Sequence, residues 1–253
     1  MRLGVLVALA GCGRVGFDGS APPDGSDVGL AAYVVAVLED KPIGYWQFEE
    51  TTGTTVHDAT ANHHDAVIRG NVTLGVPGVS GRGIEFSGGG VGNYDGGHVA
   101  IPGVFAFEDR APFSLECWVK PALLDATWRI LMSTDYWDPL QRQGYTVEYL
   151  DMNLSVDRRR DSVDDSASSS GVLSSTAWRH VAATYDGSVL QLYVDGTLRG
   201  ERPSTLSIDN DAATEFTLSH PQFTVTGVVD ECAVYAGALP AERITTHYAA
   251  RER

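Results

Sequence analysis

Oxygen-bearing side chains are the most chemically suggestive feature of this sequence. Asp58, Asn62 and Asp65 fall close together, and Asp230 and Glu231 are adjacent much later in the chain. Carboxylate and amide oxygens are hard donors, and calcium takes about six to eight such oxygens, some from loop carbonyls. Alternatively, Asp58 and Asn62 cap a turn through their side chains, and Glu231 lies on a solvated strand face. The residues alone leave both interpretations open.

Three histidines, His57, His63 and His64, lie in the same segment and raise the alternative of zinc, with Asp58 or Asp65 completing the ligand set. Adjacent residues of an extended backbone point to opposite faces, so neighbouring histidines rarely reach one ion. Histidines exposed in a turn are therefore the favoured interpretation.

Aromatic rings beside short acidic side chains indicate a second kind of chemistry. Asp135, Tyr136 and Trp137 lie in a segment, residues 134–139, that is typical of a loop. Exposing rings there is costly without a purpose, and flat rings beside Asp or Asn are surfaces on which sugars stack. We therefore predict that these three residues bind a ligand, a carbohydrate. The alternative is a loop that folds its own rings beneath itself.

Composition and motifs exclude several classes of protein. The chain has 253 residues and a formal net charge of −15, with lysine only at Lys41 and Lys120. Nucleic-acid binding needs Lys and Arg clustered on one face, so no nucleic-acid partner is expected. The sequence has no Gly-x-Ser-x-Gly turn, phosphate loop or dinucleotide fingerprint. We therefore predict no catalytic residues.

The first residues predict export. Met1 and Arg2 precede a short apolar run, which is typical of a secretory signal. The segment from Leu9 to Cys12, Leu-Ala-Gly-Cys, resembles the lipobox of bacterial lipoproteins. The resemblance implies a signal peptide over 1–11, a lipidated Cys12 and, because Gly13 follows, anchoring at the outer membrane. The alternative is a first strand with a buried cysteine.

After the signal, the chain predicts a tether and then one domain. Residues 12–32 have the Gly, Pro and Asp content of a flexible tether, and residues 33–253 are assigned to a single domain. Residues 178–196 predict a three-stranded meander, because Asp-Gly pairs tolerate the positive φ of tight turns. Residues 158–175 are predicted to form a long polar loop.

The regular elements predict the fold class. Apart from one short C-terminal helix that begins near Pro240, in which Ile244, His247 and Tyr248 recur at helical spacing, short strands dominate and no strand–helix–strand alternation is seen. We predict an all-β fold, a two-sheet antiparallel jelly-roll sandwich with one short C-terminal helix.

Seven ordered segments carry a resemblance to a known family. Over roughly residues 40–250 the chain resembles laminin-G-like jelly-roll domains of the concanavalin A-like lectin/glucanase superfamily. The segments are 44–50, 57–66, 78–86, 113–121, 178–196, 227–235 and 238–248.

The resemblance implies two antiparallel sheets packed face to face and a module that often binds glycans. In related domains calcium is held near the first acidic loop and also engages the late Asp-Glu, which makes Asp58, Asn62 and Asp230 the leading metal positions. Trp46, Trp118 and Trp178 match core positions of the family, whereas Trp128 does not.

Cysteine pairing and catalysis are also interpreted through the resemblance. If Cys12 is lipidated, Cys117 and Cys232 remain as a pair in strands that are neighbours in related jelly rolls, which predicts a disulfide. Two buried free thiols are the alternative. Glucanases of the superfamily carry a Glu-x-Asp-x-Glu strand, and residues 228–232 lack its first and last glutamates.

Together these observations predict a non-catalytic carbohydrate-binding or adhesive module of an envelope lipoprotein. We expect a monomer that reaches the membrane only through its lipid anchor and has a glycan or an envelope protein as partner. Alternatives are a protein-interaction or structural module without a sugar site and, least favoured, a glycoside hydrolase.

Overall fold

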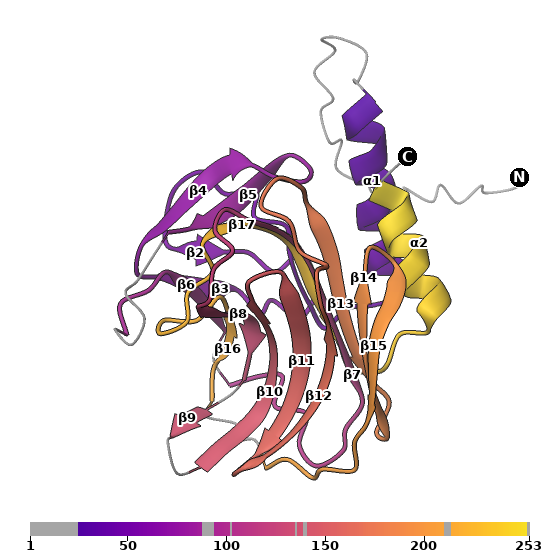
Figure 1. Ribbon diagram of the computed structural model, residues 1–253. Helices are drawn as coiled ribbons and strands as arrows, with labels where there is room; N and C mark the ends of the chain where they lie inside the picture. The colour runs from indigo at the N-terminus through magenta and orange to yellow at the C-terminus, as the bar shows by residue number, and fades with distance from the viewer. Residues whose placement is uncertain are drawn as a thin grey trace, which may run out of the picture.

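The computed structural model confirms the predicted sandwich. It describes residues 25–87, 94–101, 103–134, 136–138, 141–209 and 214–251. Within these ranges, two antiparallel sheets pack face to face, and two helices lie together at one side (Figure 1).

The first sheet is centred on β7 (Phe113–Pro121), which lies between β13 (Arg179–Tyr185) and β17 (Gly227–Tyr235). Cys117 of β7 and Cys232 of β17, 115 residues apart in sequence, form the predicted disulfide. The remaining strands of this sheet are β14 (Val189–Val194) and β15 (Thr197–Pro203) beyond β13, and β5 (Arg82–Phe86), β4 (Val72–Pro77) and β1 (Gly44–Trp46) on the side of β17.

The second sheet faces the first across the core, and its strands β10 to β12 form the curved front of the molecule in Figure 1. A short strand, β9, pairs with β10 outside the main order. In spatial order the strands are β12 (Val163–Ser169), β11 (Asn153–Arg160), β10 (Gln141–Leu150), β8 (Trp128–Ser133), β16 (Phe216–Leu218), β6 (His98–Ile101), β3 (Ala66–Arg69) and β2 (Thr55–Val56), with β9 at Tyr136–Asp138.

Apolar side chains from both sheets fill the space between them. Along β7, alternate residues enter this core, so Leu115 and Val119 are fully buried there. Trp46 is also fully buried and Trp118 nearly so, which confirms that both pack rather than bind ligand.

The meander predicted over residues 178–196 is present as β13, β14 and the start of β15. Asp195 and Gly196 both have positive φ, 51° and 70°, as a tight turn between β14 and β15 requires. Leu190, Leu192 and Val194 all face the core, which is the predicted register.

The polar loop predicted over residues 158–175 is wrong, because β11 and β12 form a hairpin there that turns at Asp161. A run of charged residues is typical of a loop, but here tertiary partners accommodate these side chains in strands. Arg158 is fully buried over the ring of Tyr185, and its guanidinium donates to Ser204 Oγ at 3.1 Å and to the Leu206 carbonyl at 2.8 Å.

A helix that the sequence did not predict, α1 (Gly25–Glu39), includes residues 25–32 of the expected tether. It packs beside α2 (Ala241–Arg251), the predicted C-terminal helix, on the outer face of the first sheet (Figure 1). Tyr33 and Val37 of α1 are buried there. Spaced four residues apart, they share one helix face, so contact with the sheet stabilises a helix in a segment whose composition resembled a tether. Residues 1–24, including Cys12, lie outside the described residues.

Candidate functional site

A groove of about 610 Å³ lies on the outer face of the second sheet, over β8, β10, β11 and β12. Strand alternation sets its lining: in β11, Leu154 and Val156 enter the core, whereas Ser155 and Asp157 face the groove. The other lining side chains come from neighbouring strands and loops, and are Trp128, Ile130, Glu148, Leu150, Asn153, Arg159, Asp164, Ser166, Ser168, Ser169, Ser170 and Phe223.

Strand pairing arranges these residues in rows across the sheet. At one end, Trp128 lies opposite Leu150, and Leu150 lies opposite Asn153. At the other end, Arg159 lies opposite Asp164. Asn153 and Arg159 are six positions apart along β11, so the groove runs for about 20 Å along the strands.

Between these ends the groove is lined with hydroxyl groups. Ser155 lies opposite both Glu148 and Ser168, and Asp157 lies opposite Ser166. The groove therefore changes from an aromatic end, through a hydroxyl-lined middle, to a charged end.

Arg159 organises the charged end. Its Nη2 lies 2.6 Å from Glu148 Oε1 and its Nη1 lies 3.0 Å from Glu148 Oε2, which is a bidentate pair. Nη1 also donates to Thr146 Oγ1 at 2.8 Å. Because the Arg159 and Glu148 side chains are only 6% and 8% exposed, the pair is held in a fixed geometry.

Two further carboxylates surround the same guanidinium. Asp157 Oδ2 lies 3.5 Å from Arg159 Nη2, and Asp164 Oδ2 lies 3.6 Å from Arg159 Nε. Burial, together with the charge of Glu148, raises the pKa of Asp157. One positive charge thus faces three carboxyl groups, and this end of the groove is acidic.

The buried carboxyl groups of the groove, Glu148 and Asp157, are hydrogen-bonded to neighbouring side chains. A retaining glycosidase needs two carboxyl groups about 5 Å apart that both face the substrate. Here both oxygens of Glu148 accept hydrogen bonds from Arg159, and Ser155 Oγ donates to Asp157 at 2.9 Å. The carboxyl groups are thus committed to neighbouring side chains.

The aromatic end is open to solvent. The side chain of Trp128 is 48% exposed, although a ring of this size is normally buried. Trp128 does not match the core tryptophans of the family, and its sequence position alone does not predict a site. The alternation of Ser155, Asp157 and Arg159 was the missed signal, because a period of two indicates a strand with one polar face.

The predicted ligand-binding residues lie beside the charged end. Tyr136 and Trp137 belong to strand β9 and not to a loop, so that prediction of local structure is wrong. Gln143 of β10 pairs with Tyr136 on one side and with Arg160 of β11 on the other, which explains why the segment is extended. Asp135 and the side chains of Tyr136 and Trp137 lie outside the described residues.

The predicted metal positions near the first acidic loop cap a turn. Asp58 accepts hydrogen bonds from the backbone N–H groups of Tyr45, Thr60 and His64 at 2.8–3.0 Å, and from Thr60 Oγ1 at 2.8 Å. Asn62 donates to the Ile43 carbonyl at 3.1 Å. The Asp58 contacts are the capping alternative, whereas Asn62 reaches the segment just before β1. No group of three or more His, Cys, Asp or Glu among the described residues could hold a metal ion. Calcium stays a prediction.

The third predicted metal position, Asp230, is buried against the loop between β4 and β5. Its Oδ2 accepts from the backbone N–H groups of Val79 and Ser80 at 2.9 Å and 3.2 Å. Its neighbour Glu231 is fully buried and accepts from the Tyr45 hydroxyl, so a solvated strand face is wrong for Glu231. Burial raises the pKa of Asp230. It also raises the pKa of Glu231, to about 8.

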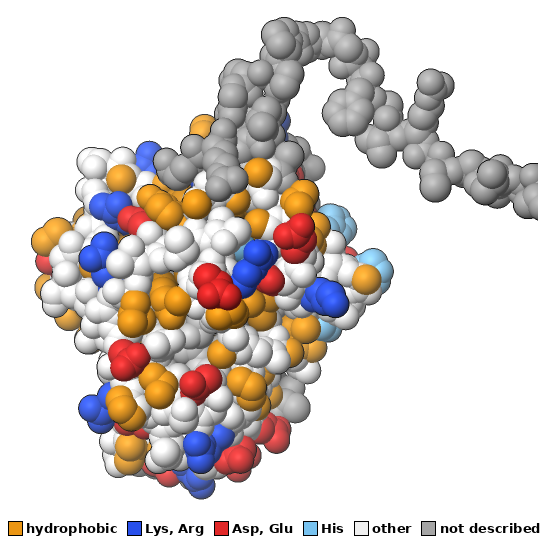
Figure 2. All heavy atoms as spheres, turned by 90° about the vertical axis from the view of Figure 1, so that its right-hand side faces the viewer, with side chains coloured by type: hydrophobic (Ala, Val, Ile, Leu, Met, Phe, Trp, Pro, Cys, Tyr) orange, Lys and Arg blue, Asp and Glu red, His pale blue; other side chains and the backbone are white. Residues whose placement is uncertain are grey.

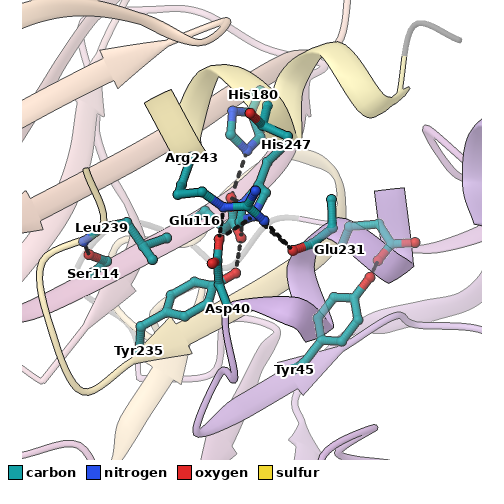
Figure 3. A network of polar contacts seen from close by, with 12 residues as sticks. Asp40, Tyr45, Ser114, Glu116, His180, Glu231, Tyr235, Leu239, Arg243 and His247 are labelled. Atoms are coloured by element: carbon teal, nitrogen blue, oxygen red, sulfur yellow. Dashed lines mark hydrogen bonds and ion pairs between the residues drawn. The ribbon is translucent and has the colours of Figure 1, made fainter. Parts of the chain in front are cut away.

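A second polar network lies beneath the two helices (Figure 3). We call Glu116, His180, Tyr235, His247 and Asp40 the sealed cluster. Glu116, on β7, accepts from Tyr235 and lies 3.1 Å from His180 Nε2 and 3.0 Å from His247 Nδ1. The side chains of Glu116 and of both histidines are fully buried.

The contacts of His247 define its charge. Its Nδ1 faces Glu116, while its Nε2 lies 2.9 Å from Asp40 Oδ2 and 3.1 Å from the Ala36 carbonyl. All these partners are acceptors, so both ring nitrogens must donate and the imidazole must be protonated. Burial disfavours that charge, but Glu116 and Asp40 outweigh burial and raise the pKa of His247.

Comparison with solved structures relates this fold to toxin binding domains. They include the binding domain of botulinum neurotoxin DC in complex with SialylT, at 14% identity and a TM-score of 0.63, covering 85% of this chain and 52% of that chain. A structure of a receptor binding domain matches at 13% identity and a TM-score of 0.65, covering 87% and 53%. A structure of botulinum neurotoxin type C, whose cell entry depends on two ganglioside molecules, matches at 13% identity and a TM-score of 0.64, covering 85% and 53%. At these identities the likeness establishes the fold alone, and this chain spans about half the length of each of those chains.

Sequence comparison identifies the family. No curated protein matches the chain. The family model described as the concanavalin A-like lectin/glucanases superfamily, of laminin G type, matches residues 92–245, which is more than half of the chain. The chain therefore belongs to the concanavalin A-like lectin/glucanase superfamily as a laminin-G-type domain.

Proposed function

We propose that this protein is a non-catalytic carbohydrate-binding module and that the groove on the second sheet is its site. The observation that carries this proposal is the exposed Trp128 at one end of a groove lined by Ser155, Ser166 and Ser168. A sugar ring presents an apolar face, which stacks on an indole, and hydroxyl groups, which exchange hydrogen bonds with serines.

The toxin domains offer limited support. One of these domains is in complex with SialylT, another belongs to a toxin whose cell entry depends on two ganglioside molecules, and a third is in complex with rat synaptotagmin II. Proteins of this fold thus include both glycan and protein binders. Since one fold hosts many functions, the argument rests on this chain's own groove.

A glycan array with the purified chain tests the proposal. We expect saturable binding, which Trp128→Ala weakens by about tenfold, because a stacked ring contributes about 0.5–1.5 kcal/mol beyond its buried area. Tyr94→Ala is the matched control, since Tyr94 is 68% exposed and lies outside the groove. Loss of binding in Trp137→Ala but not in Trp128→Ala would move the site to β9.

A protein partner is the second candidate, and the observation that favours it lies on α1. Val35 and Leu38 of this helix are 56% and 41% exposed. Absence of any glycan ligand, together with a stoichiometric protein complex disrupted by Val35→Lys, would support this candidate. On the face seen in Figure 2, Lys and Arg side chains lie singly among acidic and hydrophobic ones, in keeping with an expected partner other than nucleic acid.

We also propose that the chain is a monomer held at the outer membrane of a bacterial envelope by a lipid on Cys12. The described residues include no helix that is long and apolar enough to cross a membrane. The support is the lipobox-like segment ending at Cys12. In the producing bacterium, Cys12→Ala should shift the protein from the membrane fraction to the soluble fraction, and unchanged fractionation would contradict the anchor.

Calcium binding at Asp58, Asn62 and Asp230 is proposed separately from the groove. It is supported only by the oxygen chemistry of these side chains. Excess Ca²⁺ should raise the melting temperature in the wild type and not in Asp58→Asn. A wild-type melting temperature that excess Ca²⁺ leaves unchanged would contradict the site.

A further inference from the structure

Helix α1 lies on the outer face of the first sheet and takes no part in the core between the two sheets. Its buried residues Tyr33 and Val37 belong to a separate apolar cluster around Trp118. Within the described chain, the core between the sheets contains no residue of α1, and the disulfide of Cys117 and Cys232 lies inside that core. The core of the sandwich is therefore complete without α1.

Two cationic side chains of α2 hold the C-terminal end of α1 (Figure 3). Arg243 Nε donates to Asp40 Oδ2 at 2.7 Å, and Arg243 Nη2 donates to the Ala36 carbonyl at 3.2 Å. His247 Nε2 reaches the same two groups, at 2.9 Å from Asp40 Oδ2 and 3.1 Å from the Ala36 oxygen. Positive charge at this end of a helix also interacts favourably with the helix dipole. The attachment of α1 thus depends on charge as well as on apolar packing.

Helix α2 and the chain that follows α1 are fixed to the first sheet by contacts of their own. Ile244 of α2 is fully buried against β13 and β14, and Arg251 donates to a backbone carbonyl of the loop between β4 and β5 at 2.9 Å. Between α1 and β1 the chain turns at Lys41, which has a φ of 54°, and Ile43 then donates to a carbonyl of β17 at 2.7 Å. The segment 40–43 is therefore a hinge about which α1 can move while α2 stays in place.

The contacts of His247 make the attachment of α1 sensitive to the proton on this ring. A neutral imidazole has one N–H, whereas Glu116 faces Nδ1 and two acceptors of α1, Asp40 and the Ala36 carbonyl, face Nε2. Because Glu116 is fully buried in β7 and cannot turn away, the remaining proton stays on Nδ1. The lone pair of Nε2 then faces the two acceptors and repels the end of α1. The other titratable or charged groups around the ring are Tyr33 of α1, Arg243 of α2, Tyr235 of β17 and, through Glu116, His180 of β13.

We propose that α1 is a strap that protonated His247 holds on the first sheet, and that loss of this proton releases α1 while the sandwich stays folded. Release uncovers the sheet surface around Trp118, which Tyr33 of α1 contacts edge-on. Arg243 keeps its contact with Asp40, so deprotonation raises the population of the released helix without removing every contact. The strap lies on the first sheet and is independent of the glycan binding proposed for the groove on the second sheet.

Amide hydrogen exchange of the full chain at pH 6 and pH 9, corrected for the intrinsic exchange rate at each pH, tests this inference. We expect α1 to be less protected than β7 at both pH values. Protection of α1 should fall about tenfold at pH 9, as for the loss of one hydrogen bond to a charged group. Low concentrations of urea should accelerate exchange in β7 and leave that of α1 almost unchanged, because opening one helix exposes far less surface than global unfolding.

Substitutions assign the response to His247. His247→Gln should leave α1 weakly protected at both pH values while β7 stays protected. Glu231→Gln is the matched control, because it replaces another buried group whose pKa, about 8, lies in this range, and it should keep the response of α1. Tyr33→Ala, which removes packing and no charge, should weaken protection of α1 at both pH values and leave β7 protected. This last variant keeps the test decisive where His247→Gln does not fold.

Three results would overturn the inference. If α1 and β7 show the same protection and the same dependence on urea, the helix opens only when the whole chain unfolds. Equal protection of α1 at pH 6 and pH 9, or a response that persists undiminished in His247→Gln or disappears in Glu231→Gln, excludes His247 as the controlling group. Loss of β7 protection in Tyr33→Ala shows that the sandwich needs α1 to stay folded.

Discussion

The groove and the sealed cluster both place charged side chains on the outer face of a sheet, and they differ in how far those side chains are covered. In the groove, Arg159 and Glu148 are nearly buried, but Trp128 and Asp164 remain open to solvent. In the sealed cluster, α1 and α2 cover the sheet, and Glu116 and His247 are fully buried. The groove can therefore exchange water for a ligand, whereas the sealed cluster joins the helices to the sheet.

Covering the charges changes their energetic role. Removing one partner of a buried ion pair strongly destabilises the protein, because the other partner remains as an uncompensated buried charge. An exposed pair contributes little, since water and salt screen it. We expect stability to depend on the sealed cluster and ligand affinity to depend on the groove.

The same substitution in both regions gives the largest contrast. Glu116→Gln should lower the free energy of unfolding by about 3–5 kcal/mol, since protonated His247 loses its main counter-charge. Glu148→Gln should cost about 1–2 kcal/mol, because Asp157 and Asp164 still compensate Arg159. Chemical denaturation measures both. Equal losses would contradict the distinction between the two regions.

The pH dependence of stability sharpens the comparison. The folded-state pKa of His247 is raised, so its contribution is fully present below about pH 6.5 and is lost as pH rises through the folded pKa. Glu231 acts in the same direction, because its pKa rises to about 8: between about pH 4.5 and 8 the folded chain keeps a proton that the unfolded chain has lost, so stability falls across that range and levels off above it.

We therefore expect the melting temperature to be higher at pH 6 than at pH 9, with a stability difference of about 1–2 kcal/mol. His247→Gln should reduce this dependence to the share contributed by Glu231, and His57→Gln, at an exposed histidine, should leave it unchanged. Below about pH 4.5 the trend differs. Burial opposes ionisation of Glu116, but His247 and His180 outweigh it and lower its pKa, so stability falls as pH approaches that folded pKa. A flat profile from pH 6 to 9 would contradict protonation of His247.

The smallest expected effect is that of a substitution in the groove on the stability of the protein. Trp128→Ala should change the free energy of unfolding by less than about 1 kcal/mol, since the ring is half-exposed. Trp118→Ala should cost about 3–5 kcal/mol, because Trp118 is buried and stacks on Tyr248 of α2. Thermal denaturation of the pair checks this, and a large loss in Trp128→Ala would assign that ring to packing.

The fold was predictable where local pattern and tertiary context agree. The meander, α2, the disulfide and the two-sheet class were all expected, because their turn residues, helical spacing and family resemblance pointed the same way. The prediction was wrong for β11 and β12, because a run of arginines and aspartates is typical of a loop although it alternates with a strand period of two. It was also wrong for α1, because the first residues of that helix have the composition of a tether.

The site was predicted less well than the fold. Trp128 was set apart but unassigned, and Glu148, Arg159 and Asp164 were not considered, because they meet only when three strands pair. The sequence did not show that the Asp58 carboxylate caps a turn, and calcium binding there stays a prediction. A polar side chain's sequence position does not say which backbone groups will reach it.

By itself, the sequence determined which residues can enter a core and where tight turns form, since these depend on residue type and short spacing, and the family resemblance indicated which cysteines pair. Only the tertiary structure decided that Glu231 and His247 are buried, that Arg159 is clamped by Glu148, and that Trp128 stays exposed. The physical reason is that burial and charge pairing depend on neighbours from distant strands. Whether a polar residue is structural or available to a ligand depends on what covers it.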